Sequence, residues 1–223
     1  MSPGAQHGGA DPQAGFHWPT ERERLRDAGY EWVAGVDEAG CGAWAGPVVA
    51  AAALISLQAV LPPVRDSKQL SPAQRERLFA EIHAAGLTVT VGLAYVPEVD
   101  QLNIFRAARL AMRRAVDQLL PRPQLVLMDG HLPPDFGVPC QAVVHGDALC
   151  PIISVASIVA KVCRDRLMER LGALYPEYGF ERHRGYGTAD HREALARHGP
   201  SPVHRRSFAP VRAGEQLALE VET

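Results

Sequence analysis

The sequence of 223 residues has little of what marks membrane or secreted proteins. Its longest apolar stretch, Pro47–Leu57, is far shorter than the ~20 residues that a membrane-spanning helix needs. The first twenty residues contain neither a basic start nor an apolar block, which argues against a secretory signal. The four cysteines form no C-x-x-C pair and are too sparse for a disulfide scaffold, so we expect reduced thiols. These absences exclude a transmembrane role and predict a cytoplasmic protein.

Lysine is also scarce. Among the 23 basic residues, Lys68 and Lys161 are the only lysines, and the others are arginines. A lysine that survives in such a sequence can mark a place that needs a compact point charge, although chance explains two lysines equally well. The net charge of −2 does not suggest a nucleic-acid partner, but the region from Lys161 to Arg212 is distinctly basic, whereas the first forty residues are acidic.

The composition, with 47% hydrophobic and 22% charged residues, is typical of a folded globular domain. We predict one domain over residues 21–212, with a helical C-terminal portion from about residue 175. A flexible tail at 1–20 and a flexible acidic tail at 213–223 should flank it. No repeat of fixed period is visible, which excludes solenoids and propellers.

Hydrophobic patterns and capping signals predict the order of the elements. The expected strands are residues 31–37, 48–55, 87–95, 125–128 and 141–144. The expected helices are residues 72–85, 103–119 and 153–174. Ser71, Pro72 and Gln74 combine an N-cap, a first-turn proline and a capping-box glutamine, which fixes the start of the first of these helices. The order predicts an α/β sheet with an antiparallel first half and a parallel connection into the fourth strand.

Four acidic residues lie at or just beyond the ends of predicted strands, namely Asp37, Glu38, Asp129 and Asp147. Because side chains alternate along a strand, the adjacent pair can serve one site only if the chain bends there, which the following glycines permit. Such a carboxylate cluster suits Mg²⁺ or Mn²⁺ rather than zinc, and two such ions can hydrolyse a phosphodiester. On spacing alone, however, the last two acids are more simply explained as parts of turns.

Several motifs in this order resemble those of ribonuclease HII, the type 2 ribonucleases H, over residues 33–212. In chain order they are Val36–Gly42, Ala45–Ala51, Asp66–Lys68, Leu102–Ile104, Met128–Gly130, Gly146–Asp147, Ala156–Val162 with Arg164–Asp165, Tyr178–Phe180, His183–Thr188 and His204–Phe208. The resemblance implies a ribonuclease H-like fold, with a mixed five-stranded sheet flanked by helices and a helical C-terminal portion.

The resemblance also implies the activity. Such enzymes cut the RNA strand of RNA–DNA hybrids and nick duplex DNA on the 5′ side of embedded ribonucleotides, leaving a 3′-hydroxyl and a 5′-phosphate. The family's four metal-binding carboxylates correspond to Asp37, Glu38, Asp129 and Asp147, with Mg²⁺ or Mn²⁺ as the cofactor. Asp165 is a rival fourth acid by position, but the motif match assigns it a supporting role.

The resemblance further implies how the substrate is recognised. Backbone groups of the loop Gly40-Cys41-Gly42 should contact the 2′-hydroxyl, the group that distinguishes RNA from DNA. Tyr186 should stack on the sugar of the next nucleotide and sense the RNA-to-DNA junction. Phosphate contacts are expected from Lys68, Lys161 and Arg184. For the two lysines, a structural role is the alternative.

One departure from the family pattern lies in the 2′-hydroxyl loop, where Cys41 replaces the usual arginine. We expect activity to be retained with a poorer Michaelis constant. The alternatives are a non-catalytic hybrid-binding module on the same fold, a ribonuclease HIII-like enzyme, and a different two-metal nuclease on this fold. The HIII family carries a sizeable domain before the first strand, whereas about thirty residues precede it here. A monomer is expected, because no extra apolar stripe is left over.

Overall fold

The computed structural model describes residues 16–59 and 70–213, and its centre is a five-stranded sheet with the strand order β3-β2-β1-β4-β5. The strands are β1 (Trp32–Ala39), β2 (Val48–Ser56), β3 (Thr88–Ala94), β4 (Leu125–Asp129) and β5 (Cys140–Val143). β1, β2 and β3 pair antiparallel, whereas β4 pairs parallel with both β1 and β5. The predicted α/β class, the antiparallel first half and the parallel connection are confirmed.

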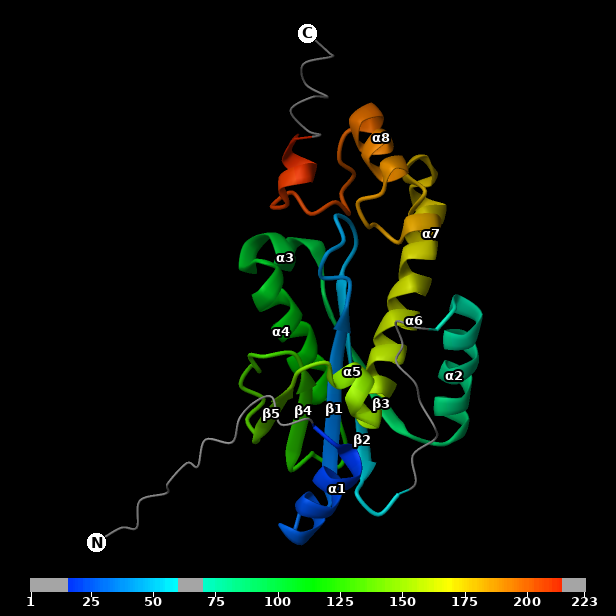
Figure 1. The fold of residues 1–223 in the computed structure, drawn as a ribbon. Coiled ribbons are helices and arrows are strands. Elements are labelled where there is room, and N and C mark those ends of the chain that lie inside the picture. The colour runs from blue at the N-terminus through cyan, green and yellow to red at the C-terminus, as the bar shows by residue number, and fades with distance from the viewer. Residues whose placement is uncertain (1–15, 60–69, 214–223) are drawn as a thin grey trace, which may run out of the picture.

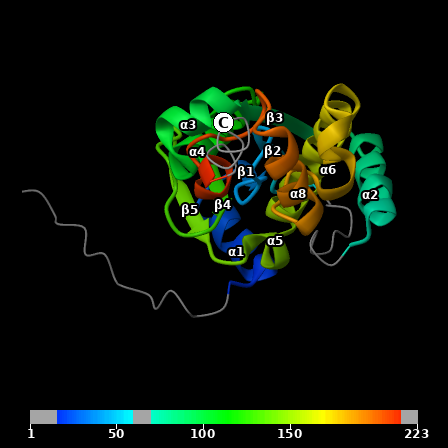
Figure 2. The same ribbon diagram turned by 90° about the horizontal axis from the view of Figure 1, so that it is seen from above.

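Helices cover both faces of this sheet. They are α1 (Trp18–Asp27), α2 (Pro72–Ala84), α3 (Val96–Leu102), α4 (Ile104–Val116), α5 (Gly146–Leu149), α6 (Pro151–Leu174), the 3₁₀ helix η2 (Pro176–Tyr178), α7 (Phe180–His183) and α8 (Ala189–His198). Figures 1 and 2 show α4 and α6 on opposite sides of the sheet, with α2 beyond α6. The short helices at the C-terminal end stand above one end of the sheet, beside the turn that joins β1 to β2 (Figure 1).

Two apolar cores lie on the two faces of the sheet. Along β1 the side chains alternate, so Val33 joins the core beneath α6, whereas Ala34 and Val36 join the core beneath α4. β2 is buried on both faces, which explains its uninterrupted apolar sequence. Gly35 allows α6 to pack directly on β1, because a Cβ there would lie 2.5 Å from the carbonyl carbon of Ile152.

The structure corrects two of the expected boundaries and adds two short helices. β1 runs on to Ala39, so Asp37 and Glu38 lie inside the strand and not at a bend. The short helices α3 and α5 were not predicted from the pattern. α1 begins at Trp18, within the predicted tail, because Trp18 and Leu25 are buried in the core; the boundary at residue 20 was therefore wrong.

Two further predictions concern Lys68 and the absence of a membrane span. Lys68 and its motif lie outside the described residues. Among the helices in the described ranges, none is long and apolar enough to cross a membrane.

Candidate active site

Three aspartates meet beside the C-terminal end of β1. One carboxylate oxygen from each of Asp37, Asp129 and Asp147 lies within 4.8 Å of the others. β1 and β4 run parallel, so the first two of these side chains lie at the same end of adjacent strands. The backbone N–H of Gly146 donates to Oδ1 of Asp129 at 2.7 Å, which brings the start of α5 and with it Asp147 to the cluster.

Glu38 lies outside this three-aspartate cluster. Since β1 continues past it as a regular strand, Asp37 and Glu38 project to opposite faces of the sheet. The Glu38 Oε1 accepts a hydrogen bond from the Cys41 thiol at 3.5 Å, on the side of the α4 core. Glu38 and Asp129 both border two cavities, one on each side of the strand end, and the charge of Asp129 acts on the Glu38 carboxyl.

The electrostatics of the cluster favour a bound cation. Burial and the neighbouring Glu38 charge raise the pKa of Asp37 well above its usual value, although a hydrogen bond with Ser157 opposes this. Burial likewise raises the pKa of Glu38. Carboxylates that repel one another in a buried place are stabilised when a divalent cation neutralises them. The donor set contains only oxygen, and it therefore fits a hard divalent ion such as Mg²⁺ or Mn²⁺.

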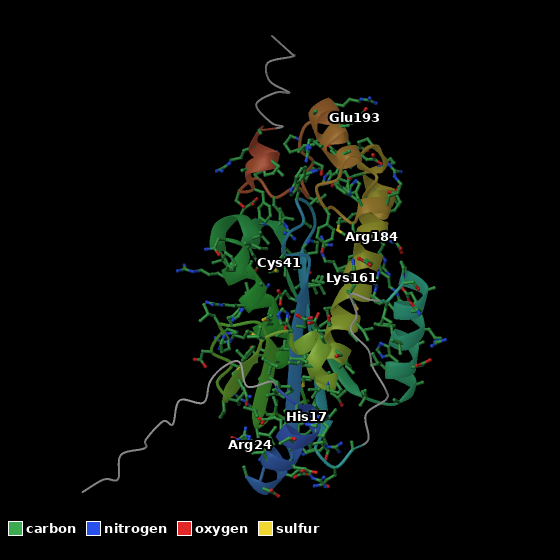
Figure 3. All side chains as sticks on the ribbon, in the orientation of Figure 1. His17, Arg24, Cys41, Lys161, Arg184 and Glu193 are labelled. Carbon is green, nitrogen blue, oxygen red and sulfur yellow. The ribbon has the colours of Figure 1, made fainter. Side chains whose placement is uncertain are left out.

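A cavity of about 380 Å³ opens above the cluster. Its lining residues are Asp37, Glu38, Ala39, Gly40, Arg75, Asp129, Ser157, Lys161 and Tyr186. The lining therefore combines three carboxylates with two cations and an aromatic ring. Figure 3 shows Cys41 at the upper end of β1, with Lys161 and Arg184 on the α6 side of the strand.

Lys161 is held in place at the wall of this cavity. Its Nζ donates to Oδ1 of Asp165 at 2.6 Å and lies 5.8 Å from the centre of the Tyr186 ring. Asp165 is thus an ion-pair partner of Lys161 and does not belong to the aspartate cluster, as the motif match implied. Burial lowers the pKa of Lys161, and the charge of Asp165 opposes that effect.

Arg184 occupies a different position from Lys161. Its Nη2 donates to Oε1 of Glu169 at 2.7 Å, its Nε lies 3.9 Å from Asp165, and it is not among the residues that line the cavity. The structure therefore places Arg184 beside the cleft, joined to it through Asp165.

Arg75 and Ser157 were missed as site residues. Arg75 reaches the cavity from the first turn of α2, which nothing in its local sequence indicates. Ser157 lies within a motif that carried the resemblance, but its contact with Asp37 depends on how α6 packs against β1.

The loop after β1 is supported from beneath by two fully buried arginines. Nε of Arg205 donates to the Gly46 oxygen at 2.9 Å, and its Nη1 donates to the Cys41 oxygen at 3.1 Å. Arg164 lies directly under Gly40, whose φ of +97° requires glycine and whose absent Cβ leaves the space for that guanidinium. The backbone of the loop Gly40 to Gly42 is thus held mainly by buried arginines, and Gly42 is exposed.

An α/β sheet that gathers carboxylates beside a cationic cleft is typical of metal-dependent hydrolases of phosphodiester bonds. Residues 34–211 match the family model for ribonuclease HII. A ribonuclease HII of Paracidovorax citrulli (strain AAC00-1) is 52% identical over 204 residues, covering 89% of this chain and 85% of that protein. The chain belongs to the ribonuclease HII family, a family of metal-dependent enzymes that cleave the RNA of RNA–DNA hybrids.

Solved structures agree with this assignment. The ribonuclease H2 of Pyrococcus horikoshii OT3 aligns with a TM-score of 0.73 at 30% identity, over 85% of this chain and 99% of that chain. A ribonuclease HII from Archaeoglobus fulgidus, solved in complex with PCNA, aligns with a TM-score of 0.63 at 27% identity, over 78% of this chain and 92% of that chain. The predicted ribonuclease H-like fold is confirmed.

Proposed function

We propose that this enzyme hydrolyses the RNA strand of hybrids and also nicks duplex DNA on the 5′ side of single embedded ribonucleotides, leaving a 3′-hydroxyl and a 5′-phosphate. The observation that carries the proposal is the three-aspartate cluster, two of whose members, Asp37 and Asp129, line a cavity together with Lys161, Arg75 and Tyr186. The carboxylates suit metal ions, and the cations suit the phosphates of a bound strand.

The metal-binding residues in this proposal are Asp37, Glu38, Asp129 and Asp147, and the ion is Mg²⁺ or Mn²⁺. When bound, two such ions would activate a water molecule and stabilise the leaving 3′-oxygen. The chain's own contribution is to hold the carboxylates at fixed positions. Asp129 is oriented by the Gly146 N–H, and like Glu38 it borders both cavities.

Recognition of the ribonucleotide is assigned to the loop of Gly40, Cys41 and Gly42 and to Tyr186. A backbone held in one conformation by buried arginines can present its amide and carbonyl groups to a 2′-hydroxyl with little loss of entropy on binding. Tyr186 lines the same cavity, which supports its assignment to the sugar of the nucleotide that follows the ribonucleotide. Lys161 is proposed as a phosphate contact, with Lys68 and Arg184 as further ones.

A cleavage assay tests this function directly. The substrates are a labelled DNA duplex with one ribonucleotide, an all-DNA duplex of the same sequence and an RNA–DNA hybrid, each with Mg²⁺, Mn²⁺ or chelator. We expect a cut on the 5′ side of the ribonucleotide that chelator abolishes and that is absent from plain DNA. Cleavage of plain DNA would instead favour a different two-metal nuclease, and binding without cleavage would favour the hybrid-binding module.

The contribution of Arg75 can be tested against a neighbour on the same helix. Arg77 is exposed and paired with Glu81, so Arg77→Ala serves as the matched control for Arg75→Ala. If Arg75 contacts a phosphate, Arg75→Ala should weaken binding of all duplex sequences and reduce the salt dependence by about one phosphate contact. Equal affinities of the two variants would remove Arg75 from the proposed interface.

The remaining predictions concern the state of the protein in the cell. A monomer remains our prediction, and sedimentation showing a stable dimer would contradict it. The cytoplasmic location also remains a prediction, which fractionation can check. The match to the ribonuclease HII family over 34–211 supports HII over the HIII alternative.

A further inference from the structure

Tyr186 lies between α7 and α8, and three buried histidines surround the segment that carries it. We call His183, His191 and His204 the histidine network; their exposed fractions are 9%, 0% and 1%. His183 and His191 stack with their ring centres 4.4 Å apart at an angle of 12°. None of these rings lines the cavity of the aspartate cluster, so the reaction itself does not account for their burial.

The hydrogen bonds of the network run in one direction. The backbone carbonyl oxygen of Tyr186 can only accept a hydrogen bond, so Nδ1 of His191 carries the proton of the 2.9 Å bond between them. The unprotonated Nε2 of His191 then accepts from Nε2–H of His204 at 3.0 Å. Nδ1 of His204 in turn accepts from the Ser201 N–H, also at 3.0 Å. Both ends of this chain are backbone groups of fixed polarity, so one tautomer is possible for each ring.

His183 fixes the other side of Tyr186. Its Nδ1 accepts from the backbone N–H of Gly185 at 3.2 Å, and its Nε2–H donates to the backbone carbonyl oxygen of Tyr178 at 2.7 Å. The preceding residue, Arg184, has a φ of +54°, a conformation that a non-glycine residue adopts only when its surroundings hold it there. The histidines therefore hold the backbone on both sides of the Tyr186 side chain.

The network also joins Tyr186 to the loop that follows the first two acids. His204 forms an isolated β-bridge with Ala45, and the Trp44 N–H donates to the Gly185 oxygen at 2.8 Å. The ring centres of Trp44 and His191 lie 5.4 Å apart. A shift of the histidines would therefore move Tyr186 relative to the loop of Gly40 to Gly42.

We propose that the histidine network positions Tyr186 against the loop of Gly40 to Gly42. Through Tyr186, His191 and His204 then determine how well the enzyme distinguishes an RNA-to-DNA junction from a continuous hybrid. The inference rests on the proposed role of Tyr186 as the junction sensor. The three histidines are positioning residues and do not touch the substrate. Both rings of the His191–His204 pair must be neutral, because a second proton on either would face another donor.

The kinetic test compares two substitutions of one ring. His191→Phe keeps an aromatic ring but removes the donor to Tyr186, whereas His191→Asn keeps a donor near the position of Nδ1. Tyr178→Phe is the matched control. It removes only the buried hydroxyl bond to the Gly199 backbone oxygen, and it keeps the ring that packs 4.8 Å from His204 and the backbone oxygen that accepts from His183. The readout is kcat/KM on a duplex with one ribonucleotide divided by kcat/KM on a continuous hybrid.

We expect His191→Phe to lower this ratio about tenfold or more, because small displacements of a positioned group have large kinetic effects. His191→Asn should restore part of it, and Tyr178→Phe should leave it unchanged even where thermal stability falls. An unchanged ratio in His191→Phe, alongside a reduced ratio in Tyr186→Ala, would overturn the histidine inference alone. An unchanged ratio in Tyr186→Ala would overturn the proposed role of Tyr186 and this inference together.

A spectroscopic measurement tests the network without any assay of activity. In long-range ¹H–¹⁵N correlation spectra at pH 7, His191 should be the Nδ1–H tautomer and His204 the Nε2–H tautomer. Burial supports neutral rings, since it lowers the pKa of His191 to about 4 and that of His204 to about 3. An Nε2–H tautomer of His191, or a charged ring, would contradict the proposed direction of the hydrogen bonds.

Discussion

Asp37 is the residue at which the needs of catalysis and of stability conflict most directly. It is 5% exposed and lies beside Glu38 and Asp129, whose charges raise its pKa further. Asp37→Asn should lower kcat by about 100-fold or more, because several kcal/mol of metal-dependent stabilisation would be lost. In chelator the same variant should melt higher, by ~2–4 °C for each kcal/mol of repulsion removed.

Calorimetry with and without Mg²⁺, together with the cleavage assay, checks both effects of Asp37→Asn. Asp165→Asn is the control, because it removes a carboxylate that is paired with Lys161 rather than repelled by neighbours. That variant should not gain stability. A fall in the melting temperature of metal-free Asp37→Asn would show that the aspartates are not mutually destabilising.

Cys41 offers a second prediction for a single residue. The buried Arg205 holds the Cys41 carbonyl, and the thiol contacts Glu38, so the loop does not depend on a long side chain at this position. Cys41→Arg should therefore leave kcat nearly unchanged and lower KM about tenfold, the effect of one charge-assisted phosphate contact of ~1.4 kcal/mol. Steady-state kinetics of Cys41→Arg and Cys41→Ser measure this, and an unchanged or higher KM for the arginine variant would refute it.

Among the elements, α6 connects the sheet to the C-terminal helices through one buried side chain. Nε, Nη1 and Nη2 of Arg164 donate to the oxygens of Pro47, Arg184 and Ala45 at 3.0–3.1 Å. Arg164→Met would leave two buried carbonyls and one partly buried carbonyl without this donor. We expect the free energy of unfolding to fall by about 3 kcal/mol or more.

Urea unfolding of Arg164→Met, compared with Arg166→Met, tests this connection. Arg166 lies on the same helix, is about half exposed and pairs with Glu76, so its loss should cost at most about 1 kcal/mol. Similar losses in the two variants would mean that the Arg164 hydrogen bonds contribute little.

The elements also show what the sequence can and cannot predict. α2 was predictable because Ser71 and Gln74 form a capping box, which is a local signal. The convergence of Asp37 and Asp129 was predictable because parallel neighbouring strands end at the same edge. That Glu38 faces away from Asp37 was not predictable, because it depends on how far β1 continues before it turns. The position of Arg75 at the cavity was not predictable either, because only tertiary packing brings α2 there.

In the molecule as a whole, the cleft is assembled from segments that are distant in sequence. The residues after β1 contact α6 through Arg164, the segment after α7 through Gly185, and the segment after α8 through Arg205. The helices at the C-terminal end are thus held against the strand that carries Asp37 and Glu38. Any condition that loosens these helices should therefore affect stability and substrate discrimination together.

Mild acid is such a condition. Unfolded histidine has a pKa near 6.5, whereas burial lowers the folded values to about 4 for His191 and about 3 for His204. Between these values and 6.5 the unfolded chain binds more protons than the folded one, so the stability is complete above about pH 6.5 and falls as the pH falls below it. The expected slope is about 1.4 kcal/mol per pH unit for each histidine.

Urea unfolding at pH 7, 6 and 5 measures this slope. His131→Asn, which replaces an exposed histidine, should show the slope of the unaltered enzyme, and His191→Phe should show a shallower one. The carboxylates of the aspartate cluster act in the opposite direction, because the raised pKa of Asp37 makes the folded state the better proton acceptor there. If the free energy of unfolding stays constant from pH 7 to pH 5 both in the unaltered enzyme and in His191→Phe, folding does not hold the two buried rings neutral.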